Sequence, residues 1–436
     1  MKIAVVGSGG AGMTAAWLLD EKHEVTLFER NAVLGGHAHS TRVEQGGHTH
    51  FADDGFAWFS DALYPTFMRL LELHGVATRI VPMSATFTQK TIGRTYVLPP
   101  TGLGPLLRTF SNPGMVAGLL RLNHAINLAK PVVHGHDLDL SWGEFLDRHK
   151  FPEPFRSQLL TPMVAGVWGG PYDRVRDFSA YTLMKYLVFH RPSGLEQYKW
   201  HVIRDGAASY IRQVAGTLRR TEILQQTAVT RLQRTADGWQ VTDSQGVTRA
   251  FDHVVLATGA RDAQQILRDV DGVDTVKQVL GGFEYYTVRL GTHSDPSFLP
   301  PRRSDWRVAN LMWDGRAATL NVWTGKHTGQ PVFTSYLQDR EPAQCHNIST
   351  FHLPLITPAH NRAQGALAAL QGRENLWLIG DWTHDIGCHE DAIVSALQVA
   401  QRLDPQLSRI ALLQSPRQHP AMHALPEQPT PPLLSP

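Results

Sequence analysis

The chain has few cysteines and few charged residues, and it has no long apolar run. Its two cysteines, Cys345 and Cys388, exclude a disulfide framework and are typical of a reducing compartment. No apolar stretch reaches the roughly 18 residues that cross a bilayer, and the first residues follow a strand pattern rather than that of a signal peptide. Charged residues make up 18% and the net charge is +2, which gives no argument for nucleic-acid binding. We therefore expect a cytoplasmic protein without a transmembrane segment or a nucleic-acid partner.

What the chain does contain is a glycine-rich N-terminus. Residues 2–6 read as a buried strand, and a G-x-G-x-x-G turn follows before a helical pattern at 13–19. In such a turn the first glycine makes the tight bend, the second lets a pyrophosphate approach, and the third allows helix–strand packing. A second strand, at 23–28, ends on an acid that is placed to bond a ribose hydroxyl. These features predict a dinucleotide site formed by Gly7, Ser8, Gly9, Gly10, Ala11, Gly12 and Glu29.

Three further segments favour FAD over a nicotinamide cofactor. They are Arg30 with the run Gly35-Gly36-His37, the strand end Ala257-Thr258-Gly259, and Gly380-Asp381 followed by the helix start at 389–392. A second pair of bare glycine backbones lets a cofactor extend past the first helix. Asp381 is placed to bond ribityl hydroxyls, and the partial positive charge of a helix start suits the N1–C2=O edge of a reduced flavin. The alternative is that Glu390 and Asp391 only cap that helix.

The length of 436 residues predicts two domains. The cofactor domain is predicted to combine residues 1–62, 201–262 and 346–412, whereas 63–200 and 263–345 form a substrate domain. The proline-rich segment 413–436 is predicted to be disordered. Asp237-Gly238 predicts a hairpin between a strand over 225–232 and one over 239–242. The pattern at 115–128 predicts an amphipathic helix that covers a domain core or, alternatively, lies on a membrane surface.

The chain resembles the amine-oxidase-type flavoproteins, which have a glutathione-reductase-like FAD fold. It is most similar to the bacterial predicted NAD/FAD-binding proteins associated with cyclopropane-fatty-acid synthase. The resemblance spans roughly residues 1–403 and rests on the stretches GSGGAGMTAAWLL, LFERNAVLGGHAHS, DDGFAWFSDALYP, PMVAGVWG, KWHVIRDGAASYIRQ and LWLIGDWTHDIGCHEDAIVSAL.

The resemblance implies an α/β fold with a Rossmann-like FAD-binding domain and a second, mixed α+β domain. It implies FAD contacts at the residues named above and at His389, Glu390, Asp391 and Ala392. It also places the Asp53-Asp54-Gly55 segment and Phe56 along the flavin ring and the backbone of Val229 beside the adenine. The chain departs from the family at Asp205-Gly206-Ala207-Ala208, at Val188 to Pro192 and at Gly259. These departures put the family's usual substrate pocket in doubt for this chain.

The function predicted from these features is hydride transfer from a C–H bond of a largely apolar substrate to flavin N5. The family's genomic setting favours a lipid or fatty acyl chain. His389 and Glu390 are the candidates for polar groups near the ring, and Trp168 and His190 for the pocket wall. Two alternatives stay open: an amine oxidase that releases peroxide, and a redox-neutral FAD protein acting as an isomerase or lipid-binding partner.

Neither the histidines near the N-terminus nor Cys345 indicates a metal site or a covalent flavin. The alternating histidines His37, His39, His48 and His50 lie without cysteines or carboxylates at zinc-like spacing, so no metal is predicted. Cys345 precedes the strand at 376–380 as a flavin-tethering cysteine does in some amine oxidases, but its context does not match. We therefore predict non-covalent FAD. The oligomeric state is left open.

Overall fold

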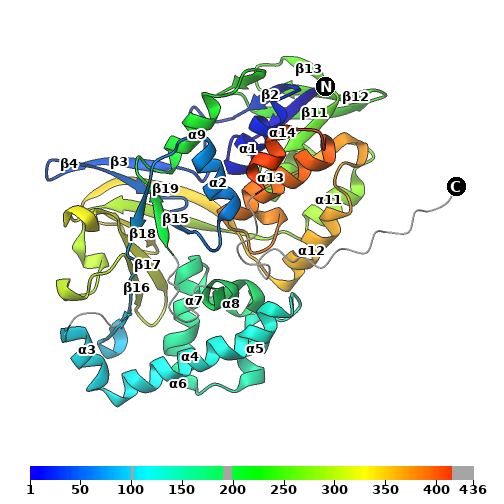
Figure 1. Ribbon diagram of the computed structural model, residues 1–436. Helices are drawn as coiled ribbons and strands as arrows, with labels where there is room; N and C mark the ends of the chain where they lie inside the picture. Colours follow the sequence, from blue (N-terminus) through cyan, green and yellow to red (C-terminus); the bar gives the residue numbers. More distant parts are fainter. Residues whose placement is uncertain (100–102, 190–198, 415–436) are drawn as a thin grey trace.

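A five-stranded parallel sheet occupies the upper right of the computed structural model, which describes residues 1–99, 103–189 and 199–414 (Figure 1). In spatial order its strands are β10 (Thr221–Leu224), β2 (Glu24–Phe28), β1 (Lys2–Val6), β14 (His253–Leu256) and β20 (Leu376–Leu378). Every neighbouring pair in this sheet is parallel. Three distant parts of the chain therefore build one Rossmann-like sheet, as the sequence predicts.

Both faces of the parallel sheet are buried because successive side chains along a strand point to opposite sides. Ile3 and Val5 pack into one core, whereas Ala4 and Val6 pack into another. The first core lies under α1 (Gly10–Leu19), α2 (Pro65–Leu73), α9 (Ala207–Ala215), α13 (His389–Leu403) and α14 (Ser408–Leu413). The second core lies under α10 (Ala260–Ile266), α11 (Asp274–Leu280), α12 (Pro358–Ala368) and the antiparallel sheet of β11 (Val229–Thr235), β12 (Gly238–Asp243) and β13 (Thr248–Phe251).

The predicted hairpin is confirmed, since β11 and β12 pair antiparallel; its turn residues are Ala236 and Asp237, and Gly238 already pairs with Thr235. The bounds of the strand predicted over 225–232 are wrong, because only residues 229–232 of that range lie in a strand, β11. The chain breaks at Gln226, which has a left-handed φ of 52° and donates its N–H to the carbonyl of Asn31 at 3.1 Å. This break separates β10, in the parallel sheet, from β11, in the antiparallel one.

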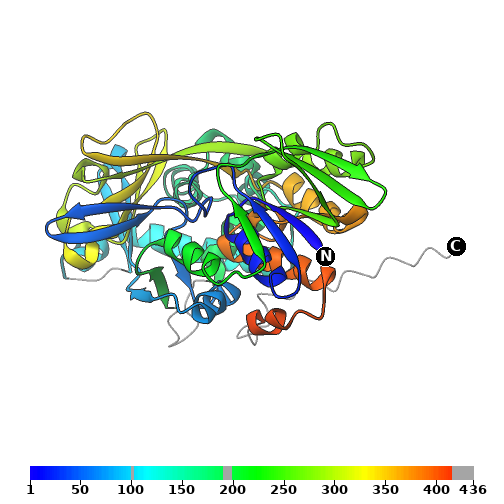
Figure 2. The ribbon, with the colours of Figure 1, turned by 90° about the horizontal axis from the view of Figure 1, so that it is seen from above.

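A second, seven-stranded sheet lies at the left of Figure 1 and is mostly antiparallel. In order it contains β19 (Cys345–Pro354), β15 (Tyr285–His293), β18 (Phe333–Leu337), β17 (Ala318–Trp323), β16 (Ala309–Trp313), β7 (Ala85–Gln89) and β8 (Arg94–Leu98). Two smaller sheets are the ribbon β3 (Ser40–Gln45) with β4 (His48–Asp53), and β5 (Phe59–Ser60) with β9 (Trp200–Ile203) and β6 (Thr78–Val81). Seen from above, long strands connect the two halves (Figure 2). Because β19 pairs along the whole of β15, we propose that residues 346–354 belong to the substrate domain and that the last part of the cofactor domain begins after Pro354 rather than at 346.

Helices form the lower layer of Figure 1 and enclose a third apolar core. They are α3 (Leu103–Phe110), α4 (Pro113–His134), α5 (Trp142–His149), α6 (Glu153–Phe155), α7 (Thr161–Trp168) and α8 (Ala180–Phe189). The helix predicted at 115–128 is longer at both ends, and Pro131 lies within its last turn. Among the described residues, no helix is both long and apolar enough to cross a bilayer.

Candidate active site

The glycine-rich turn after β1 has the three properties that a pyrophosphate site requires. Gly7 has a φ of +104°, a backbone conformation that favours glycine. A Cβ on Gly12 would lie 1.9 Å from the carbonyl oxygen of Gly7, so only glycine lets α1 pack this closely on β1. A Cβ on Gly9, in contrast, would find its nearest neighbour at 3.9 Å, an ordinary contact distance, so the protein does not crowd this position before the N-terminus of α1.

Glu29 lies beside this turn and is 5% exposed. Its Oε2 accepts hydrogen bonds from the Ser8 N–H at 3.1 Å and the Ser8 hydroxyl at 2.5 Å, and its Oε1 accepts from the Asn31 N–H at 2.8 Å. A carboxylate offers about four acceptor positions, so one remains for a ribose hydroxyl. The Glu29 carbonyl accepts from the Thr227 N–H at 2.8 Å, which brings the segment before Val229 next to the same acid.

The second glycine pair and the end of β14 lie against the first turn. The Ser8 hydroxyl accepts from the Gly35 N–H at 3.2 Å, and a Cβ on Gly36 would lie 3.3 Å from the Cα of Gly9. Ala257 donates its N–H to the Val6 carbonyl at 2.8 Å. Arg30 differs from these residues, because it is exposed and pairs with Asp262 at the surface at 3.4 Å.

The start of α13 meets the start of α1 at His389. The His389 ring stacks on Phe56 at 4.2 Å between centroids, and its Nε2 hydrogen-bonds the Tyr210 hydroxyl at 2.8 Å. A Cβ on Gly10 would lie 2.6 Å from the ring. Burial lowers the pKa of His389 to about 3, with repulsion from His37 as a further cause. His389 is therefore a neutral, aromatic-packed group at neutral pH.

The two carboxylates that follow His389 make helix-capping contacts. Glu390 accepts from the backbone N–H groups of Thr66 at 2.9 Å and Phe67 at 2.8 Å, in the first turn of α2. Asp391 accepts from the Cys388 N–H at 2.8 Å and closes the capping box of α13. Asp391 thus caps its own helix, as the alternative interpretation expects, whereas Glu390 caps the neighbouring helix α2. A catalytic role for Glu390 stays a prediction without geometric support. Ala392 is buried in the same first turn.

Asp381 begins a short turn after β20, and Gly380 before it has a φ of +150°. Burial raises the pKa of the Asp381 carboxyl, while His37 acts in the opposite direction. The neighbouring Trp382 donates its indole N–H to the Thr258 carbonyl at 2.9 Å. This bond joins the strand end at 257–259 to the segment that precedes α13.

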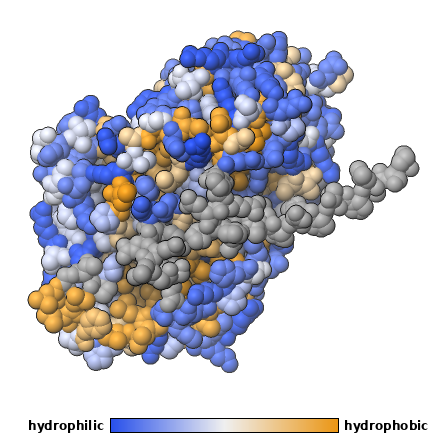
Figure 3. Space-filling model, viewed as in Figure 1, coloured by the Kyte–Doolittle hydropathy of each residue, from blue (hydrophilic) through white to orange (hydrophobic). Residues whose placement is uncertain are grey.

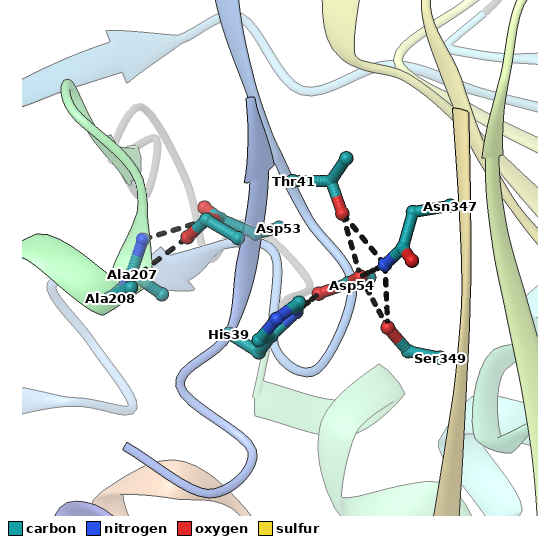
Figure 4. A network of polar contacts seen from close by, with 9 residues as sticks. His39, Thr41, Asp53, Asp54, Ala207, Ala208, Asn347 and Ser349 are labelled. Atoms are coloured by element: carbon teal, nitrogen blue, oxygen red, sulfur yellow. Dashed lines mark hydrogen bonds and ion pairs between the residues drawn. The ribbon is translucent and has the colours of Figure 1, made fainter. Parts of the chain in front are cut away.

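A polar network that the sequence does not reveal surrounds Asp53 and Asp54 at the end of β4. Figure 4 shows Asp53 directed toward the N-terminus of α9 and Asp54 toward β19. Asp54 accepts from His39 Nδ1 at 2.6 Å and from the Ser349 hydroxyl at 2.7 Å. Burial acts to raise the pKa of Asp54, but these bonds outweigh it and hold the pKa below its ordinary value. The next residue, Gly55, packs against the backbone of His37, since a Cβ on Gly55 would lie 1.8 Å from the His37 carbonyl oxygen.

We predict that Asp53→Asn changes the pH dependence of stability. Asp53 accepts from the Ala207 N–H at 2.7 Å and the Ser40 hydroxyl at 2.6 Å, and burial raises its pKa from 3.8 to about 7. The folded chain therefore binds more protons than the unfolded chain between these values, and the free energy of unfolding falls as pH rises through them. Asparagine keeps the acceptor but does not titrate. Between about pH 4 and about pH 7 the melting temperature should fall less in Asp53→Asn than in the wild type. The control variant Asp139→Asn, at an exposed residue, should follow the wild type. An Asp53→Asn melting profile parallel to that of the wild type would contradict the raised pKa of Asp53.

The predicted pocket residue Trp168 lines an apolar cavity between α7 and α8. The other lining residues are Met163, Val164, Val167, Leu183, Tyr186 and Leu187. The Trp168 carbonyl accepts from the Tyr286 hydroxyl at 2.7 Å, which ties the end of α7 to β15. Cys388, immediately before His389, packs against both the parallel-sheet core and the helical core. The other predicted pocket residue, His190, lies outside the described residues.

A buried ion pair that sequence reasoning missed holds the segment before α13 to α8. Lys185 contacts Asp385, and the Tyr181 hydroxyl lies 2.9 Å from both Lys185 Nζ and Asp385 Oδ1. Lys185 is 4% exposed. Burial acts to raise the pKa of Asp385, but the Lys185 ammonium outweighs it and lowers that pKa. The segment between β20 and α13 therefore carries Asp381 and the acid of this ion pair, and it leads directly into His389.

The histidines and cysteines add no metal centre within the described ranges, where no group of three His, Cys, Asp or Glu side chains is placed to hold an ion. His48 and His50 lie on the β3–β4 ribbon. Cys345 begins β19 and is exposed. Non-covalent attachment of FAD stays a prediction.

Comparison with known proteins identifies the family. The model of flavin-containing amine oxidoreductases matches residues 11–288. Coproporphyrinogen III oxidase of Bacillus subtilis (strain 168) is 21% identical over 366 residues, which are 72% of this chain and 73% of that protein. The 15-cis-phytoene desaturase of Synechococcus elongatus is 26% identical over 176 residues, which are 37% of this chain and 36% of that protein.

Solved structures share the fold over nearly the whole chain. A fatty acid isomerase from P. acnes superposes with a TM-score of 0.67 at 16% identity and covers 92% of this chain and 98% of its own. Cyclohexylamine oxidase from Brevibacterium oxydans IH-35A superposes with a TM-score of 0.66 at 16% identity, and the match covers 92% of this chain and 99% of that one. The special closeness to proteins associated with cyclopropane-fatty-acid synthase stays a prediction. The chain belongs to the family of flavin-containing amine oxidoreductases and is an FAD-dependent oxidoreductase.

Proposed function

We propose that this enzyme oxidises a C–H bond of a largely apolar substrate, with a fatty acyl chain as the preferred class. The observation that carries the proposal is the apolar lining at Trp168, which α7 and α8 form around a cavity with room for little more than one water molecule. Aliphatic and aromatic side chains dominate that lining, which suits a hydrocarbon chain. The core around it reaches Cys388, next to His389 at the start of α13. An acyl chain would enter between α7 and α8 only if these helices moved apart, because the cavity itself is too small to hold it.

The residues around the glycine-rich turn fit FAD, since neighbouring atoms do not crowd Gly9 and Glu29 retains an acceptor position. When bound, FAD supplies a hydride acceptor at its N5. The protein then needs to orient the substrate and exclude water. Phe56 and the neutral His389 would provide a stacked, uncharged wall, whereas Glu390 and Asp391 are engaged in capping bonds. This arrangement supports an uncharged reacting group over a cationic one.

Anaerobic mixing tests the proposal. Long-chain fatty acids or acyl esters should bleach the oxidised flavin absorbance of the purified holoenzyme, and mass spectrometry should find a product two hydrogens lighter. Trp168→Ala should raise the half-saturating acyl concentration by about tenfold, because it removes a large apolar contact from the cavity. Its flavin content and melting temperature, measured in parallel, separate a pocket effect from misfolding.

Other outcomes would overturn the proposal. Bleaching by a panel of amines, with peroxide release in air and no reaction with acyl compounds, would identify an amine oxidase. An acyl product of unchanged mass, formed without net flavin reduction, would identify a redox-neutral isomerase. A half-saturating concentration that is the same in Trp168→Ala and the wild type would remove the cavity from the substrate path.

A further inference from the structure

The most exposed apolar side chains of the described residues gather on two adjoining helices. Leu103, Leu107 and Phe110 of α3 are 74%, 62% and 66% exposed, and Leu120 of α4 is 65% exposed. These four values exceed those of every other large apolar side chain that the structure describes as exposed. Figure 3 shows the resulting apolar area at the lower left of the molecule, over α3 and the start of α4. We call these four residues the α3–α4 patch.

The helical spacing makes the patch a continuous face. Leu103, Leu107 and Phe110 are separated by four and three residues, so they lie on one side of α3. The opposite side of α3 is anchored, because Pro105 and Thr109 are buried and Arg108 pairs with Asp305. On α4, Leu120 lies on the exposed side, whereas Met115, Gly118 and Ala125 are buried. The four side chains therefore face solvent from a firmly packed base.

The segment of the chain that carries the patch contains charge of one sign. No aspartate or glutamate occurs in the chain between Glu72 and Asp137, although six cationic residues do: Arg79, Lys90, Arg94, Arg108, Arg121 and Lys130. Arg121 follows Leu120 and is exposed, as is Lys130; among the described residues neither forms an ion pair. The Arg94 guanidinium lies beside Gly114, at the first turn of α4. Exposed apolar side chains flanked by unopposed cations are typical of surfaces that dip into anionic lipid.

We propose that the α3–α4 patch docks the enzyme on the surface of an anionic lipid bilayer. Leu103, Leu107, Phe110 and Leu120 enter the interface, and Arg121 and Lys130 contact lipid phosphates. A second copy is a poorer partner, because a two-fold contact would bring the same cationic surfaces together. The C-terminal segment 415–436 carries a single acid, Glu427, together with Arg417 and two histidines, so it offers no anionic complement. The proposal does not depend on the substrate, since docking is measured without turnover.

Vesicle flotation of the full-length, FAD-loaded protein tests the docking. Phosphatidylcholine vesicles containing phosphatidylglycerol should bind the protein at least about tenfold more tightly than pure phosphatidylcholine vesicles. Leu107→Asp combined with Phe110→Asp should weaken binding to the anionic vesicles by more than about tenfold. Arg121→Gln combined with Lys130→Gln should bring binding to the two vesicle types closer together. Flavin content and melting temperature should be unchanged in both double variants, because all four substituted side chains are exposed.

Val247→Asp is the matched control, since Val247 is a 43% exposed apolar residue in the turn before β13, away from the patch. Equal loss of binding in this variant would overturn the proposal. Absence of wild-type binding to both vesicle types would overturn it too. A concentration-dependent dimer in light scattering that Leu107→Asp with Phe110→Asp abolishes would assign the patch to a second copy instead.

Discussion

Replacing Lys185 with methionine is expected to lower the free energy of unfolding by about 3–5 kcal/mol. The Lys185 ammonium is buried in contact with Asp385, and the substitution leaves that carboxylate without its counter-charge. Burial and the charge of Asp385 already raise the pKa of the nearby Asp391, and Lys185 opposes this shift. Its loss therefore leaves two carboxyl groups in one apolar region. Urea unfolding of the holoenzyme, followed by circular dichroism, measures the change.

Two controls make this prediction specific. Arg362→Met breaks an exposed pair with Asp139 and is expected to cost no more than about 1 kcal/mol. Combining Lys185→Met with Asp385→Leu removes both charges, and the double variant should recover much of the lost stability. An equal, small effect in Lys185→Met and Arg362→Met would show that the pair is not buried in solution.

Gly12→Ala is expected to remove FAD from the protein. The new Cβ would lie 1.9 Å from the Gly7 carbonyl oxygen and 3.0 Å from the Ala257 side chain, with backbone as the nearer obstacle. Neither β1 nor α1 can move aside easily, because Ile3, Val5 and every residue of α1 are buried. The turn must therefore open, and its N–H groups no longer converge on a phosphate. Flavin released per chain should fall at least about tenfold.

Gly365→Ala is the matched control for this substitution. Gly365 lies within α12, and a Cβ there meets nothing within 4 Å. Alanine should leave the flavin content unchanged and raise the free energy of unfolding by about 0.5–1 kcal/mol through its helix propensity. Full flavin content in Gly12→Ala would contradict the close packing described for the turn.

The elements predicted well are those encoded by short stretches of chain. The strand at 2–6, the turn after it and the hairpin of β11 and β12 each depend on residues within a few positions of one another. The strand over 225–232 was predicted to begin too early, because Gln226 bonds the carbonyl of Asn31, almost two hundred positions away in the chain, and β11 begins only at Val229. Local pattern has no access to such a contact.

The sequence by itself determined that the chain builds a dinucleotide turn, because glycine spacing and strand periodicity are local backbone constraints. The sequence also predicted FAD as the cofactor, from Gly35-Gly36 and Gly380-Asp381 taken together with that turn. Only the tertiary structure decided what the remaining polar residues do. Glu390 caps α2, Asp54 bonds Ser349, and Lys185 meets Asp385. Each of these pairs joins residues that lie far apart in the chain, and the partner of a buried charge is chosen by packing rather than by spacing.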